Sequence, residues 1–187
     1  MGQPVYVWDL PLRIFHWALV FCVAGSIISG SIGGNGFIWH FRFGYAVIVL
    51  LVFRIIWGFV GSKFSRFSSF PPSPGRAIAY LKDPATIEKS VHGHNPLGAF
   101  SVYAMLACLV FQVSTGLFAN DAIMWDGPLK NYVSNAWSDR LTSWHQINRM
   151  IMFVLIGTHL AAITFYTLFK KQPLVRAMLS GYKKPTA

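Results

Sequence analysis

The sequence predicts an all-α protein, a four-helix transmembrane bundle formed by one domain over residues 1–187. The chain is 54% hydrophobic and 16% aromatic but only 12% charged, and its mean hydropathy is positive. Soluble domains carry about twice that fraction of charged residues. Four apolar segments each reach the roughly 20 residues that a helix needs to cross a bilayer. The length therefore suits a single membrane bundle with no separate soluble domain.

The elements follow from the apolar segments and from the residues that interrupt them. Asp9 and Pro11 suit the cap and the first turn of the first helix. The N-terminus lacks a basic region before an apolar stretch with a cleavage site, so we expect the first span to be retained. Seven tryptophans cluster towards the segment ends, as an interfacial belt requires. The expected spans are residues 12–32, 37–60, 97–119 and 144–169.

Basic residues alternate between the connections and predict the orientation. The connection 61–96 and the tail after residue 169 each carry five lysines and arginines, whereas 33–41 carries none and 120–143 carries two beside three aspartates. The positive-inside rule then places both termini and the middle connection in the cytoplasm. The formal charge of +10 lies in these connections rather than along one polar face, so nucleic acid is not an expected partner. Residues 75–82 fit a short amphipathic helix on the membrane surface, although a structural surface loop is the commoner case.

Histidines inside the spans form the pattern that indicates chemistry. His145 and His159 are fourteen residues apart, so they leave one helix on nearly the same face, roughly 21 Å apart along its axis. His16 is expected at the depth of His159 near the cytoplasm, and His40 at the depth of His145 on the outer side. A single histidine in an apolar helix is more often a hydrogen-bonded core residue, but several at matching depths favour ligation. Because neutral imidazole is a good axial ligand for haem iron, the two pairs predict two six-coordinate haems.

The cysteines bear on how such haems would be held. Cys22 and Cys108 both lie in apolar segments, and the sequence contains no Cys-x-x-Cys or Cys-x-x-Cys-His motif. A redox dithiol and a covalently attached haem are therefore not indicated. The two expected haems are bound non-covalently.

Arginines and a glycine occur at spacings that bring them towards the haems. Arg54, fourteen residues after His40, is expected at the cytoplasmic level. It either meets an anionic haem propionate or snorkels to the cytoplasmic headgroups. Arg149 and Arg42 are expected beside the outer haem, with interfacial anchoring as the alternative. Gly44, one turn after His40, leaves space for a porphyrin plane.

Two further pairs have alternative roles. Gly98 and Gly116 lie five turns apart on one face of the third span, which either passes both haems or packs tightly against another helix. His92 and His94 precede that span. They fit a cytoplasmic surface pair better than a role in proton exchange or quinone contact beside the inner haem.

Five segments together carry a resemblance to a known family: Val7–Trp17, Trp39–Tyr45, Gly93–Gly98, Trp144–His145 and Thr158–His159. They resemble the prokaryotic cytochrome b561 family, and within it the b-type cytochrome subunits related to those of nickel-iron hydrogenases. The resemblance covers nearly the whole chain. It implies a four-helix bundle with two haem b groups, and by motif position it implies His16, His40, His145 and His159 as the axial ligands of the iron.

The resemblance also implies a function. We expect a multi-pass protein of the bacterial cytoplasmic (inner) membrane that transfers electrons between the quinone pool and a periplasmic redox protein, either a hydrogenase or a c-type cytochrome. The alternative is a stand-alone quinone-linked oxidoreductase that oxidises superoxide. A transporter or metal-handling protein is disfavoured because the four apolar cores contain no aspartate or glutamate. Membrane lipid surrounds such a bundle, which is also compatible with an oligomer.

Polar residues outside the histidine set offer candidate contacts for these partners. Gln112, Ser114 and Thr115 supply polar groups in the third span that suit a quinone, although residues beside either haem would serve as well. The outer connection carries three aspartates that either dock a protein partner or belong to a solvated loop: Asp121, Asp126 and Asp139.

Overall fold

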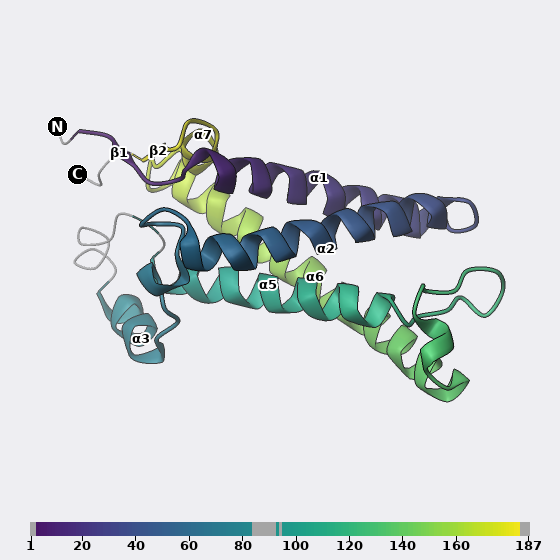
Figure 1. Cartoon of the computed structure of the whole chain (residues 1–187). Helices are drawn as coiled ribbons and strands as arrows, with labels where there is room; N and C mark the ends of the chain where they lie inside the picture. The colour runs from purple at the N-terminus through teal and green to yellow at the C-terminus, as the bar shows by residue number, and fades with distance from the viewer. Residues whose placement is uncertain (1–2, 84–92, 94, 184–187) are drawn as a thin grey trace. The chain divides into compact units, whose positions relative to one another are not determined.

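The computed structural model describes residues 3–83, 93 and 95–183, and helices dominate it (Figure 1). Within these residues, four helices are long and apolar enough to cross a membrane. They are α1 (Leu10–Ile32), α2 (Gly36–Val60), α5 (Pro96–Gly116) and α6 (Asn135–Leu168). The all-α fold is thereby confirmed, and one candidate membrane helix overlaps each of the four expected spans. His92 and His94 lie outside the described residues.

The ends of the helices differ from the expected spans where local capping overrides hydropathy. Asp9 caps α1 as expected, since its Oδ1 accepts a hydrogen bond from the backbone N–H of Leu12 at 2.8 Å. α6 begins at Asn135, nine residues before the expected start at 144, because Ser134 accepts a hydrogen bond from the N–H of Trp137 and begins the helix in polar sequence. α5 ends at Gly116 rather than at residue 119, because the chain beyond it pairs with residues 127 and 129 through backbone hydrogen bonds.

The chain divides into two compact units, and each of the four long helices contributes a segment to each unit. Unit 1 comprises Met1–Trp17, Val52–Tyr103 and Gly157–Ala187. Unit 2 comprises Ala18–Leu51 and Ala104–Ile156.

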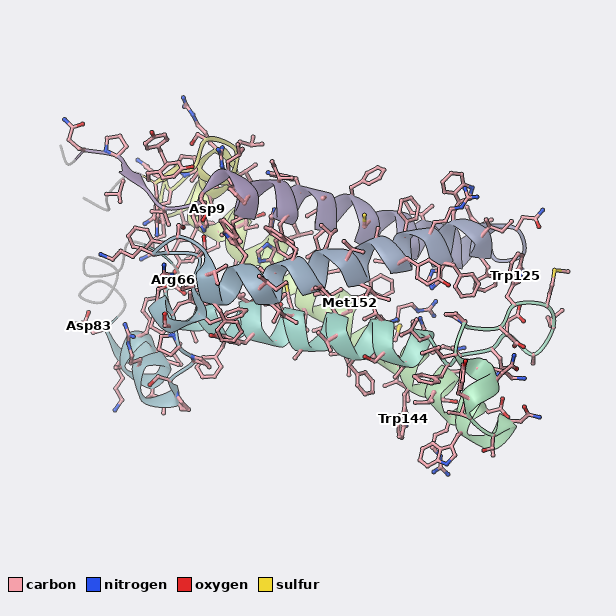
Figure 2. The ribbon with its side chains drawn as sticks, viewed as in Figure 1. Asp9, Arg66, Asp83, Trp125, Trp144 and Met152 are labelled. Atoms are coloured by element: carbon pink, nitrogen blue, oxygen red, sulfur yellow. The ribbon has the colours of Figure 1, made fainter. Side chains whose placement is uncertain are left out.

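Unit 2 has an apolar core to which all four helices contribute. Cys22 comes from α1, Val47 and Leu51 from α2, Leu109 from α5, and Met152 (labelled in Figure 2) from α6. Large apolar side chains on the outward faces remain exposed in the protein alone, as expected for helices that face lipid. The short 3₁₀ helix η2 (Lys130–Tyr132) lies in the connection between α5 and α6.

In unit 1, a segment near the N-terminus pairs with a segment near the C-terminus. The strand β1 (Val5–Tyr6) pairs antiparallel with β2 (Tyr182–Lys183), and Figure 1 shows both strands beside α7 (Leu174–Ser180). Gly181 ends α7 with a φ of +88°, a left-handed conformation that glycine adopts at little cost. The N–H of Val7 then bonds to the carbonyl oxygen of Gly181 at 2.9 Å, which places the start of α1 next to the C-terminal segment.

The middle connection contains the 3₁₀ helix η1 (Phe67–Ser69) and the helix α3 (Pro74–Lys82). Residues 75–82 therefore form the short helix that was the alternative to the favoured surface loop. Ser73 caps it, and its buried residue Tyr80 meets the hydroxyl of Tyr166 on α6. Asn95 donates a hydrogen bond to the Tyr166 hydroxyl at 2.8 Å, so α3 is attached to the bundle through a polar contact.

Candidate functional site

The four intramembrane histidines lie as two pairs, one in each unit. His40 of α2 and His145 of α6 belong to unit 2, where their ring centroids are 6.1 Å apart and their planes are inclined by 78°. His16 of α1 and His159 of α6 belong to unit 1, within electrostatic range of each other. This proximity within each pair agrees with the depths expected from the sequence.

Both rings of the unit 2 pair are oriented through Nδ1. His40 donates from Nδ1 to the carbonyl oxygen of Ser26 on α1 at 2.9 Å, and His145 donates from Nδ1 to the carbonyl oxygen of Gln112 on α5, also at 2.9 Å. A neutral ring that donates through Nδ1 keeps its lone pair on Nε2. Metal-binding histidines commonly use this arrangement, because the second hydrogen bond fixes the tautomer and the ring orientation.

A glycine makes room for each of these rings. A Cβ on Gly30 would lie 2.8 Å from Nδ1 of His40, and a Cβ on Gly116 would lie 2.9 Å from Cε1 of His145. Gly30 follows Ser26 by four residues on α1, and Gly116 follows Gln112 by four residues on α5. The carbonyl of Ser26 or Gln112 already accepts the helical hydrogen bond, and the missing Cβ lets the imidazole reach its second lone pair. Gly116 was expected on a face that either passes both haems or packs tightly against another helix, and its close approach to His145 was not anticipated.

A buried polar network connects His145 to Gln112 and Asn148. Gln112 donates from Nε2 to Nε2 of His145 at 3.1 Å, and Asn148 donates from Nδ2 to Oε1 of Gln112 at 2.6 Å. Asn148 also donates to the carbonyl oxygen of Cys108 at 3.0 Å and accepts from the Cys108 thiol. Asn148 was not among the candidates, although it lies one helical turn after His145 and shares its face of α6.

The unit 2 pair opens into a cavity of about 440 Å³. That volume lies in the range of small-molecule sites. Its lining includes both histidines, Gly44, Gln112 and Arg149, and Cβ placement at Gly44 meets open space. Arg42 instead is exposed and lies over the ring of Trp39 at 4.7 Å. Arg149 is therefore the arginine that the described part of the chain brings to this cavity.

The unit 2 site fits a metal held between two imidazoles. A metal ion about 2 Å from one nitrogen of each ring separates the ring centroids by roughly 6 Å, close to the observed 6.1 Å. A pair of imidazoles suits a metal whose other ligands come from a macrocycle, and the cavity beside Gly44 offers space for one. Gln112 contacts Nε2 of His145, so its amide must rotate away when that nitrogen binds a metal.

Unit 1 holds buried polar atoms that have no hydrogen-bond partner among the described residues. Arg54 is only 3% exposed, and its guanidinium lies over the ring of Phe67 at 4.5 Å. One of its terminal nitrogens and Nδ1 of His16 are both buried and unpaired. The burial of Arg54 is incompatible with a side chain that snorkels to the headgroups. A buried cation with an unused donor suits an anionic group of a ligand.

Asp9 forms a second polar centre in unit 1, at the start of α1 (Figure 2). Its carboxylate accepts hydrogen bonds from the hydroxyls of Ser62 and Ser65 and from the indole N–H of Trp57, in addition to the cap to Leu12. Burial raises the pKa of Asp9, but these hydrogen bonds outweigh burial, so the net pKa is lower than usual. The carboxylate is therefore ionised at neutral pH.

Comparison with known proteins places nearly the whole chain in one family. Residues 7–181 match the family model described as prokaryotic cytochrome b561. The chain is 26% identical to a probable Ni/Fe-hydrogenase B-type cytochrome subunit of Rhizobium leguminosarum bv. viciae, covering 96% of this chain and 88% of the relative. The chain is 25% identical to the protein of the same description from Bradyrhizobium diazoefficiens, covering 98% of this chain and 88% of the relative. It is 24% identical to a probable Ni/Fe-hydrogenase 1 B-type cytochrome subunit of Escherichia coli K12, covering 95% of this chain and 90% of the relative. No solved structure gave a significant match.

Proposed function

The chain belongs to the prokaryotic cytochrome b561 family and is a multi-pass membrane b-type cytochrome that transfers electrons; from this premise we propose that it holds two haem b groups, one at each histidine pair. The observation that carries the proposal is the unit 2 pair. His40 and His145 stand 6.1 Å apart beside a cavity, and each donates from Nδ1 to a backbone carbonyl. These features support iron ligation through Nε2.

The chain's own residues would orient and charge-balance each haem. His40 with His145, and His16 with His159, would hold the two haem irons. Arg54 would bind a propionate in unit 1, where its unused donor supports that role, and Arg149 would do the same at the unit 2 cavity that it lines. When bound, the haem iron supplies reversible one-electron oxidation and reduction.

Two haems at the two pairs form a path through the membrane. Fourteen residues of the continuous helix α6 separate His145 from His159, which corresponds to roughly 21 Å of helical rise. The hydrocarbon core is about 30 Å thick, so the two pairs would serve opposite halves of it. The basic residues of the middle connection and the tail support a cytoplasmic side for both termini and for the His16–His159 pair.

The redox partners follow from the family and from the names of the relatives. Those names support a hydrogenase as the redox partner. Its position at the outer face, a c-type cytochrome as the other periplasmic candidate, and the quinone pool as the membrane partner are proposed from the resemblance to the family. A quinone takes up two electrons and two protons to become a quinol, so two successive one-electron transfers through the haems balance one quinone.

Haem quantification tests the proposal directly. The chain, purified in detergent, is expected to contain two non-covalent haem b groups per polypeptide by pyridine haemochrome spectroscopy; one haem or none overturns it. The partner is tested by following haem reduction after hydrogen is added to membranes that contain, or lack, the associated hydrogenase. Rapid quinone reduction by the isolated chain with superoxide, and no response to hydrogen, would instead identify a stand-alone oxidoreductase.

A further inference from the structure

Unit 1 contains a buried negative charge that the proposed ligand set does not use. The Asp9 side chain is only 9% exposed, whereas Asp83, the other carboxylate among the described residues of this unit, is exposed. The groups that donate to Asp9 are all neutral: two serine hydroxyls, an indole N–H and a backbone N–H. They hold the carboxylate in its charged form without cancelling its charge.

The same hydrogen bonds join the start of α1 to the end of α2. Ser65 is fully buried and donates to Asp9 at 2.6 Å, and Trp57 donates at 3.2 Å. Trp57 stacks on Phe53 with ring centroids 5.7 Å apart, and Phe53 contacts Phe15 of α1. The carboxylate and this aromatic stack therefore hold one turn of α1 against one turn of α2.

Both helices carry a residue of the unit 1 site close to this junction. His16 lies on α1, seven residues after Asp9, which caps that helix. Arg54 precedes Trp57 by three residues on α2 and interacts electrostatically with Asp9. A change at Asp9 thus acts on the guanidinium of Arg54 and on the start of the helix that carries His16.

We propose that Asp9 is a positioning residue for the unit 1 haem, and that its fixed charge lowers the reduction potential of that haem. This inference rests on the proposed function, since it requires a haem at His16 and His159. A negative charge in a medium of low dielectric constant stabilises the ferric form, which carries one more positive charge than the ferrous form. Arg54 acts in the opposite sense, so the pair of charges sets the potential jointly.

Redox titration of single variants tests the charge. The unit 1 haem signal is first identified as the one lost in His159→Ala. Asp9→Asn keeps the size of the side chain but removes its charge and replaces one acceptor oxygen by an N–H donor, and it is expected to shift that signal to a more positive potential. Ser65→Ala removes one donor but keeps the charge, and Asp139→Asn removes a carboxylate of unit 2; both are expected to leave the unit 1 potential nearly unchanged.

The positioning role has a readout that needs no haem. Amide hydrogen exchange at Leu12 in haem-depleted protein is expected to become faster in Asp9→Asn, because the capping carboxylate is weakened. If Asp9→Asn does not retain the unit 1 haem, Asp9→Glu decides the matter, since it keeps the charge. A low potential in Asp9→Glu supports the inference, and loss of the haem in both variants overturns the role of the charge.

The outcomes separate this inference from the proposed function. If no haem signal depends on His159, the proposed function fails. If that signal is present and Asp9→Asn leaves its potential unchanged, the proposed function stands and the inference about Asp9 is wrong.

Discussion

Asn148 of α6 donates a hydrogen bond from Nδ2 to Oε1 of Gln112 on α5 at 2.6 Å. Both side chains are buried, with 6% and 9% of their surface exposed. The bond orients the Gln112 amide so that its N–H points at Nε2 of His145, 3.1 Å away. Asn148 therefore holds the Gln112 amide beside Nε2 of His145, although it does not touch that ring.

Removal of the Asn148 amide should destabilise the protein. Asn148→Leu removes the donor to Oε1 of Gln112 and to the carbonyl oxygen of Cys108. A buried polar group left without a partner costs about 1–3 kcal/mol. We expect a lower Tm for thermal unfolding in detergent. Ser143→Ala is the control on the same helix, because its exposed hydroxyl bonds only to its own helix. Equal Tm values for the two variants would contradict the network.

Loss of one histidine should remove one haem and spare the other. His145→Ala is expected to lower the haem content from two per chain to one, because its partner His40 belongs to the same unit. His159→Ala should remove the other haem by the same reasoning. Pyridine haemochrome spectroscopy and low-temperature absorption spectra measure both effects. Identical residual spectra in the two variants would show that the pairs are wrongly assigned.

A methyl group at Gly116 or at Gly30 should displace the imidazole ring that lies against it. Gly116→Ala places a Cβ 2.9 Å from the His145 ring, and Gly30→Ala places one 2.8 Å from the His40 ring. Both variants are expected to lose most of the unit 2 haem, measured as haem per chain after purification. Gly75→Ala in α3 is the matched control, since its Cβ meets no atom within 4 Å. Full haem content in all three variants would refute the close approach.

Arg54 should be needed for haem retention in unit 1. A hydrogen bond to a charged group is worth about 1.5–3 kcal/mol, so Arg54→Gln is expected to speed haem loss about ten- to a hundredfold. Arg42→Gln is the control, because that side chain is exposed and stacked on Trp39. The measurement is haem transfer to an apoglobin acceptor, followed at the unit 1 signal. Equal loss rates in both variants would exclude a propionate contact at Arg54.

Asp9 should make the free energy of unfolding depend on pH in the acidic range. Its pKa is lower in the folded protein than the usual value of 3.8, so the carboxylate contributes stability at pH values above about 4. That contribution is lost as the pH falls through the lowered pKa. We expect the Tm difference between wild type and Asp9→Asn to be largest near pH 7 and to shrink below about pH 4. A difference that does not change with pH would rule out this linkage.

The sequence by itself determined the features that depend on one helix at a time. Apolar length predicted the four spans, and the fixed period of the helix placed His145 and His159 on nearly one face of α6. The Asp9 cap was equally predictable, because a cap concerns only a residue and the turn that follows it. The early start of α6 was missed because hydropathy does not detect the polar turns that Ser134 caps.

Only the tertiary structure decided which side chains meet across helices. Asp9 reaches Trp57, Ser62 and Ser65 from 48, 53 and 56 residues away. Gln112, considered for a quinone, turned out to be bonded to His145 and Asn148, and Arg149 rather than Arg42 lines the unit 2 cavity. The physical reason is rotation: local periodicity defines a face, but the angle at which that face meets a neighbouring helix depends on packing along the whole interface.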